Sequence, residues 1–219
     1  MLLALDVGNS NIVIGCIENG EISHVFRMVT NINKTEYEYA VEMKSILDFE
    51  GIDTKGFDGA IISSVVPPLV NVLKTAVKKV TGKTALVVSA GIKTGMNILI
   101  DDPATLGSDL VADGVAAMTH YKLPVIVFDM GTATTISVID KDGNFIGGAL
   151  CPGVQLSMNA LASGTSQLPR VPIEPTQKAI CTNTVDCMKS GAIYGTAAMI
   201  DGMIDRFEEE LGMKATVVA

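Results

Sequence analysis

Short apolar runs separated by small polar residues dominate the first thirty positions of the chain. Leu2–Leu5 leads into Asp6-Val7-Gly8, and Ile12–Ile14 follows the polar stretch Asn9-Ser10-Asn11. Apolar runs of this length, bounded by turn residues, are typical of buried strands. We therefore predict three strands, over about residues 2–7, 12–18 and 21–30, with Asn19-Gly20 as the tight turn between the second and the third.

The same pattern returns 123 positions later, at Asp129-Met130-Gly131. An apolar run precedes this triplet and another follows it, and the register continues without a gap, so that Asp142-Gly143 falls on Asn19-Gly20. Each copy predicts a strand, an Asp-x-Gly turn, a second strand, a hairpin turn and a third strand. We interpret this as an internal duplication, with the second set of strands at about 124–130, 134–140 and 144–150.

Helices and strands alternate along the rest of the chain. Thr35 with Glu38 three residues later predicts a capped helix start, and Pro67-Pro68 is tolerated in the first turn of another helix. Helices are predicted over about 35–49, 67–80, 108–121 and 185–211 and around 156–162, and strands over 59–66, 85–88 and 215–219. Ser108 or Asp109 is the expected cap of the third helix, and Asn183-Thr184 that of the last. The segments 91–102 and 165–182 have the pattern of loops.

Strands separated by helices indicate an α/β fold, and the duplication indicates two domains, residues 1–118 and 119–219. Of the 219 residues, 48% are hydrophobic and only 5% aromatic, which predicts an aliphatic core. The net charge of −8 argues against a nucleic-acid partner, because an acidic surface repels a polyanion. The four cysteines show no C-x-x-C pairing, which argues against zinc. Scattered cysteines, with no signal peptide and no membrane-spanning run, predict a cytoplasmic protein.

The chemistry of the two Asp-x-Gly turns suits a nucleotide phosphate. Glycine lets the backbone approach a ligand closely, and consecutive small residues can point amide N–H groups at phosphate oxygens. An aspartate at the end of a strand can hold Mg²⁺ directly or through its waters. Asp-Gly and Asn-Gly pairs also mark simple hairpins. Here, however, the Asp-x-Gly motif is separate from the hairpin turn and recurs in register, which favours the phosphate-binding interpretation.

Several motifs then follow one another along the chain: the two Asp-x-Gly hairpin units, Gly107-Ser108-Asp109, Gly147-Gly148 with Pro152-Gly153, Leu168–Val171 and Asn183-Thr184. Their order resembles that of type III pantothenate kinases, from Met1 to the last residue. These kinases belong to the acetate-kinase, sugar-kinase, Hsp70 and actin superfamily. The resemblance implies two duplicated ribonuclease H-like domains with mixed sheets, facing across a cleft. It also implies ATP-dependent phosphorylation of pantothenate to 4′-phosphopantothenate, the first step of coenzyme A biosynthesis.

By the same resemblance, a first phosphate loop is formed by Asp6, Val7, Gly8, Asn9, Ser10, Asn11, Ile12 and Val13. Within it Asp6 is expected near Mg²⁺, and Thr132 belongs to the second phosphate loop. Asp129 is expected to help bind a monovalent cation, K⁺ or NH₄⁺. Asp109 matches the general base for the substrate hydroxyl. The pantothenate contacts, which in the family meet at a homodimer interface, match Gly107, Ser108, Asp109, Leu110 and Thr184.

Three departures from the family pattern concern the acceptor and the adenine. Leu110 stands where the family usually has arginine, and leucine cannot replace a fork-shaped donor. Ile100 replaces the usual tyrosine, with Asp102-Pro103 after it. The chain also stops before the Thr-Gly-Gly segment expected near the adenine, so we expect the second domain to be incomplete at its end. These departures predict that phosphate and metal binding persist while pantothenate recognition is weakened or altered.

Two alternatives to the pantothenate kinase interpretation remain open from the sequence. The first is a kinase with the same machinery that accepts a different small hydroxyl compound. The second is a degenerate nucleotide-binding paralogue with a regulatory or non-catalytic role. The retained Asp6, Asp109 and Asp129 favour an enzyme, because a pure binding module has less need of all three carboxylates.

Overall fold

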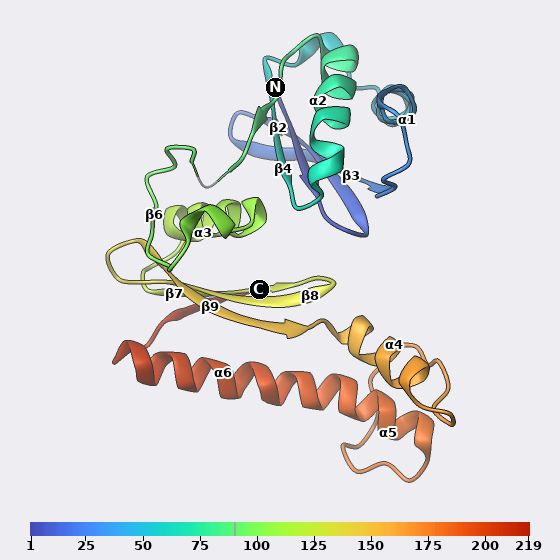
Figure 1. Cartoon of the computed structure of the whole chain (residues 1–219), viewed down its shortest axis with the longest axis vertical. Coiled ribbons are helices and arrows are strands. Elements are labelled where there is room, and N and C mark those ends of the chain that lie inside the picture. The colour runs from blue at the N-terminus through green and yellow to red at the C-terminus, as the bar shows by residue number, and fades with distance from the viewer. Residues whose placement is uncertain (90) are drawn as a thin grey trace. The chain divides into compact units, whose positions relative to one another are not determined.

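The computed structural model describes residues 1–89 and 91–219, which form two compact units. The first unit comprises residues 1–94 and 102–113, and the second comprises residues 95–101 and 114–219. Each unit is built on one five-stranded sheet with helices, so the α/β class predicted from the sequence is confirmed. Figure 1 shows the elements of both units in the order of the chain.

The first unit has the strand order β3-β2-β1-β4-β5. Strands β1, β2 and β3 form an antiparallel meander, and β4 and β5 extend the sheet parallel to β1. The strands are β1 (Leu2–Val7), β2 (Asn11–Glu18), β3 (Glu21–Val29), β4 (Gly59–Ser64) and β5 (Leu86–Val87). At the tip between β2 and β3, Asn19 and Gly20 both have positive φ, as the predicted tight hairpin turn requires.

Helices α1 (Glu36–Phe49) and α2 (Pro67–Thr81) pack on one face of this sheet. The capping box predicted at the start of α1 is present, because Thr35 accepts from the Glu38 amide and Glu38 accepts from the Thr35 amide. Alternate residues of β1 and β2 face these helices and are fully buried with Tyr39. The other residues of β1, Asp6 among them, therefore point to the opposite face.

The second unit has the strand order β10-β7-β8-β9-β6. Its meander is β7 (Val125–Met130), β8 (Ala133–Ile139) and β9 (Asn144–Pro152), and β10 (Thr216–Val218) lies parallel to β7 as β4 lies parallel to β1. The β9-β8-β7-β10 order thus repeats the β3-β2-β1-β4 order of the first unit, which confirms the duplication. Strand β6 (Asn97–Ile98) adds to the free edge of β9, although the sequence predicted only a loop there.

Helices α4 (Val154–Gly164), α5 (Thr184–Ser190) and α6 (Thr196–Leu211) belong to the second unit. The apolar face of α6 packs along the sheet against alternate residues of β7 and β8 (Figure 1). A five-residue π-helical stretch, Gly191–Gly195, separates α5 from α6, so the single helix predicted over 185–211 is interrupted. Helix α3 (Ser108–His120) has residues in both units. Within the described residues, no helix is long and apolar enough to cross a membrane.

The two meanders differ by one residue in the register of their middle strands. In the first unit Asp6 lies opposite Val13, whereas in the second Asp129 lies opposite Thr135. The gapless sequence repeat would instead match Val13 with Ile136. The turn between β7 and β8 is one residue shorter than the turn between β1 and β2. The turn between β8 and β9 is one residue longer than the turn between β2 and β3, so β9 returns to the register of the repeat. The expectation of an unbroken register was therefore wrong for β8.

Candidate functional site

The first Asp-x-Gly turn follows directly on β1. The carboxylate of Asp6 is exposed, and the amide of Gly8 donates to the carbonyl of Asn11 at 3.0 Å, which closes the turn. This amide is therefore occupied within the turn rather than directed at a ligand. The side chains of Val7 and Ile12 are fully buried in the core, so any contact they make with a nucleotide would use their backbone.

Thr30, the residue after β3, fixes this turn from the side. Its amide donates to the carbonyl of Ser10 at 3.1 Å, and its hydroxyl donates to the carbonyl of Gly8 at 2.7 Å. Two hydrogen bonds from one residue to opposite sides of a four-residue turn restrict its backbone. Asn9 stays exposed at the tip of the turn.

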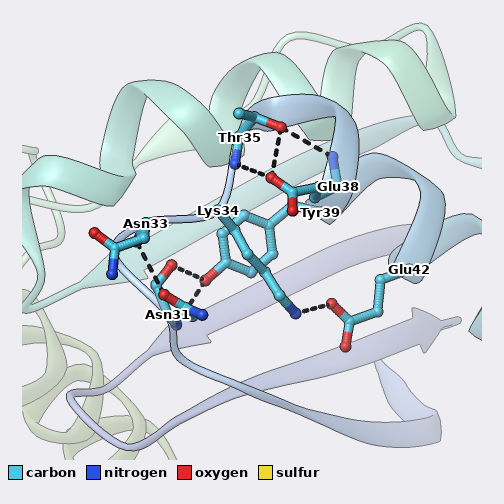
Figure 2. A network of polar contacts seen from close by, with 7 residues as sticks. All are labelled: Asn31, Asn33, Lys34, Thr35, Glu38, Tyr39 and Glu42. Atoms are coloured by element: carbon cyan, nitrogen blue, oxygen red, sulfur yellow. Dashed lines mark hydrogen bonds and ion pairs between the residues drawn. The ribbon is translucent and has the colours of Figure 1, made fainter.

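The segment after Thr30 is held in turn by Tyr39 of α1, as Figure 2 shows. The buried hydroxyl of Tyr39 donates to the carbonyl of Asn31 and accepts from the amide of Asn31, both at 2.9 Å. Lys34 pairs with Glu42 at 2.5 Å and lies over the Tyr39 ring. The hydrogen bond to Glu42 raises the pKa of Lys34. Lys34 is thus engaged within this network.

The second Asp-x-Gly turn is built on the same backbone plan. The amide of Gly131 donates to the carbonyl of Ala133 at 3.0 Å, and the amide of Gly153 donates to the carbonyl of Thr132 at 3.1 Å. A Cβ at Gly153 would lie 2.3 Å from the carbonyl oxygen of Gly131, so only glycine fits there. In the 123-residue repeat Gly153 corresponds to Thr30, and both residues anchor the turn of their own unit.

The start of α3 is attached to the end of β4 through a buried hydroxyl. Ser108 accepts hydrogen bonds from the Ser63 hydroxyl (3.1 Å) and the Ser64 amide (2.8 Å), and donates to the Ser64 carbonyl (3.0 Å). Ser108 is the first residue of α3, and its hydroxyl is used on β4 rather than as a helix cap. The capping role considered for Ser108 was therefore wrong.

Asp109 follows in the first turn of α3 and is half-buried. Its Oδ1 accepts from the Leu110 amide at 2.8 Å. The same oxygen would lie 2.3 Å from a Cβ at Gly107, so the carboxylate rests against the bare Cα of this glycine. The geometry fixes Oδ1 and leaves the carboxylate at the N-terminal end of α3, where negative charge is favoured.

Within the first unit, the first turn and the start of α3 both lie at the carboxyl ends of the central strands β1 and β4. Asp6 on β1 lies beside Ser63 on the adjacent parallel strand β4, and Ser63 donates to Ser108. Asp6 and Asp109 are thus connected through the carboxyl ends of neighbouring parallel strands. Open α/β sheets bind their ligands outside the carboxyl ends of their strands.

The chain is similar in sequence to proteins of one known family. The model of the type III pantothenate kinase family matches residues 2–206. The chain is 39% identical over 219 residues to the type III pantothenate kinase of Halalkalibacterium halodurans and 41% identical to that of Brevibacillus brevis. Each alignment covers all of this chain and 86% of the relative. The chain belongs to the type III pantothenate kinase family.

A solved structure of a Baf family protein from Campylobacter jejuni has the same fold. The two chains superpose with a TM-score of 0.55 at 20% identity, over 92% of this chain and 78% of the other. At this identity the likeness supports the architecture of two duplicated α/β domains and nothing finer.

Thr184, which the family resemblance assigns to pantothenate, lies in the second unit at the start of α5. Asn183 caps this helix as predicted, because its side chain accepts from the Asp186 amide at 2.9 Å. Thr184 lines an apolar cavity of about 570 Å³ between the end of β9, α4 and α5, together with Cys151, Met158 and Leu168. All four cysteines of this kinase family member are unpaired.

The sequence predicted which carboxylates belong to the site, but it did not predict the residues that position them. Thr30 and Tyr39 anchor the first turn, and Ser63 with Ser64 anchors α3. The available signal was weak: a small polar pair at the end of a buried strand, and a threonine that the repeat matches with Gly153. Among residues 1–89 and 91–219, no group of three or more His, Cys, Asp or Glu residues could hold a metal ion.

Proposed function

We propose that this chain transfers the γ-phosphoryl group of ATP to the primary hydroxyl of pantothenate, in the first step of coenzyme A biosynthesis. Membership of the type III pantothenate kinase family supports this proposal. The observation that carries it is the attachment of Asp109 to the sheet edge beside Asp6, through Ser63 and Ser108. The two carboxylates assigned to phosphoryl transfer thus lie in the first unit, Asp6 on β1 and Asp109 on α3, and the Ser63–Ser108 hydrogen bond attaches α3 to the strand beside β1.

Phosphoryl transfer needs positioning and charge neutralisation more than covalent catalysis. In the proposed reaction the hydroxyl oxygen of pantothenate bonds to the γ-phosphorus, the bond to the β–γ bridging oxygen breaks, and ADP leaves. The hydroxyl proton passes to the Asp109 carboxylate, whose Oδ1 is held by the Leu110 amide. A carboxylate that accepts the proton late in the transfer needs no unusual affinity for it.

The two turns of the duplicated hairpins are assigned to the phosphates and their cations. Exposed small residues of the first turn, Asn9 and Asn11, would contact ATP, and Thr132 would do so from the second. A single exposed carboxylate, Asp6, fits an Mg²⁺ ion that keeps most of its water. That ion would neutralise phosphate charge when bound. Asp129, at the matching place on β7, is assigned to a monovalent cation, K⁺ or NH₄⁺.

The acceptor is assigned to Gly107–Leu110 and to Thr184. Leu110 presents an apolar side chain where related kinases usually carry arginine, so this part of the site lacks a guanidinium donor. Leu110 therefore favours one alternative acceptor, another small hydroxyl compound with more apolar character.

A homodimer and a cytoplasmic location complete the proposal. Exposed apolar side chains in the second unit, including Leu156, Leu161 and Tyr194, support self-association.

The test is ATP-dependent phosphorylation of pantothenate by the purified chain, with Mg²⁺ present and K⁺ or NH₄⁺ varied. Asp109→Asn should lower kcat by roughly 10²–10⁴-fold. Asp48→Asn, which changes an exposed carboxylate on α1, should leave kcat unchanged. Leu110→Arg should lower KM for pantothenate by about tenfold, since a charge-assisted hydrogen bond contributes about 1.5–3 kcal/mol.

Three outcomes of this assay distinguish the pantothenate kinase, the kinase for another acceptor and the non-catalytic paralogue. Turnover that needs Asp109 supports the proposal. Turnover of another hydroxyl compound, with pantothenate accepted only after Leu110→Arg, favours the altered acceptor. No turnover by either protein, with ATP binding still measurable by calorimetry, overturns the kinase proposal and favours a non-catalytic paralogue.

A further inference from the structure

One buried side-chain oxygen lacks a hydrogen-bond partner among the residues that the structure describes, and it is Thr135 Oγ1 on β8. A hydroxyl taken out of water without a partner is unfavourable, so such atoms are rare in folded proteins and call for a specific explanation. A bound ion that the hydroxyl oxygen coordinates is one such explanation.

The position of Thr135 on the sheet indicates which ion its hydroxyl oxygen would coordinate. The register of β7 and β8 places Thr135 directly opposite Asp129. Directly opposite residues of antiparallel strands project from the same face, with Cβ atoms about 4.5–5.5 Å apart. Asp129 Oδ1 lies beside the second Asp-x-Gly turn, 3.9 Å from where a Cβ of Gly131 would be. The Asp129 carboxylate and the Thr135 hydroxyl thus project from the same face of the sheet at the end of β7.

The first unit provides an internal comparison. Its matching carboxylate, Asp6, lies opposite Val13, whose side chain has no oxygen. Mg²⁺ keeps several waters and needs few protein ligands, so one carboxylate is enough at that position. Potassium is bound in proteins by oxygens that replace its hydration shell, so a second protein oxygen is required where potassium binds. The duplicated hairpins therefore differ at the residue that distinguishes these two kinds of cation.

We propose that Thr135 Oγ1 is a ligand, together with the Asp129 carboxylate, of the monovalent cation in the second unit. The donor set fits, because carboxylate and hydroxyl oxygens are hard ligands suited to hard cations. The inference rests on the proposed function in one respect, the assignment of Asp129 to that cation. It goes further in naming the neutral ligand and in explaining why the corresponding position of the first unit cannot bind the same ion.

The test measures binding of K⁺ itself, independently of turnover. Thermal unfolding of the chain is followed while KCl replaces choline chloride at constant ionic strength, with NaCl in parallel. A ligand that binds the folded state raises Tm in proportion to the logarithm of its concentration above Kd. The unmodified chain and Thr135→Ser should respond to K⁺. Thr135→Val and Thr135→Ala should bind K⁺ at least tenfold more weakly.

A second readout separates a cation ligand from an ordinary structural hydroxyl. Without K⁺, Thr135→Val should melt no lower than the unmodified chain, and by about 2 °C higher, because it removes an unpartnered buried hydroxyl. A hydroxyl that merely stabilised the sheet would give a lower Tm instead. Thr119→Val, the same change at an exposed site on α3, should leave the K⁺ response intact.

Asp129→Asn distinguishes failure of this inference from failure of the functional assignment. If Asp129→Asn loses the K⁺ response while Thr135→Val keeps it, Thr135 is no ligand and the assignment of Asp129 stands. If both variants respond to K⁺ like the unmodified chain, or if the unmodified chain does not respond, the cation site itself is wrongly placed. Loss of the response in both variants, with retention in Thr135→Ser, supports the inference.

Discussion

Ser108→Ala tests whether the buried hydroxyl at the start of α3 holds the proposed base in place. The substitution removes one oxygen and leaves the helix and its sequence otherwise unchanged. Three hydrogen bonds disappear with it: one accepted from the Ser63 hydroxyl, one accepted from the Ser64 amide and one donated to the Ser64 carbonyl. Alanine is a strong helix former, so the change carries no propensity penalty of its own.

The magnitude follows from these three bonds. Each contributes about 0.5–1.5 kcal/mol net, so their loss should cost about 1.5–4.5 kcal/mol. Ser63 and Ser108 are both buried, and water cannot easily replace the missing partner, which favours the upper half of that range. Against a total stability of about 5–15 kcal/mol for a typical domain, the change is large. A looser α3 also displaces Asp109, and a shift of about 1 Å in a catalytic group can cost about 10²-fold in rate.

The assay combines urea unfolding with the pantothenate phosphorylation rate. Ser108→Ala should lower the free energy of unfolding by about 3 kcal/mol and kcat by about tenfold or more. Ser45→Ala, at an exposed position of α1, is the matched control and should change stability by less than about 0.5 kcal/mol. A Ser108→Ala protein as stable and as active as the unmodified chain would refute the reasoning that β4 positions Asp109.

Two further substitutions act on neighbouring anchors. Gly107→Ala should move the Asp109 carboxylate, because its Oδ1 would lie 2.3 Å from the new Cβ. We expect kcat to fall about tenfold, while the free energy of unfolding changes by less than about 1 kcal/mol. An unchanged kcat in a steady-state assay would contradict this. Tyr39→Phe leaves the Asn31 amide and carbonyl without their partner, so we expect a loss of about 1–3 kcal/mol in urea unfolding and a raised KM for ATP. Tyr37→Phe, at an exposed residue of the same helix, should change neither.

Local chemistry explains why the sequence predicted most element boundaries. The capping box of Thr35 and Glu38, the Asn19-Gly20 turn and the Asn183 cap all depend on residues within three positions of each other. Their preferences act before any tertiary contact forms. The same is true of the meanders, whose apolar runs are long enough to show a strand pattern.

The elements that the sequence missed depend on distant partners. Strand β6 is two residues long and exists because it pairs with β9. The π-helical stretch Gly191–Gly195 has no separate sequence signal within an otherwise helical segment. In the site, the Ser64 amide meets Ser108 across 44 positions, and the Thr30 hydroxyl meets Gly8 across 22. A single sequence predicts candidate carboxylates by their type and context, but it does not pair hydroxyls over such separations.

The duplicated hairpins share one backbone plan, to which we assign two different chemical roles. In both units a glycine amide closes the turn and the residue after the third strand anchors it: Thr30 in the first unit and Gly153 in the second. These shared features give the two turns the same backbone framework, which we assign to phosphate. The residue opposite the turn carboxylate differs, Val13 in one unit and Thr135 in the other, because β8 is displaced by one residue. The displacement replaces an apolar neighbour with an oxygen. In the proposed function, this oxygen gives the second turn a side-chain ligand that the first turn lacks, without altering the fold of either unit.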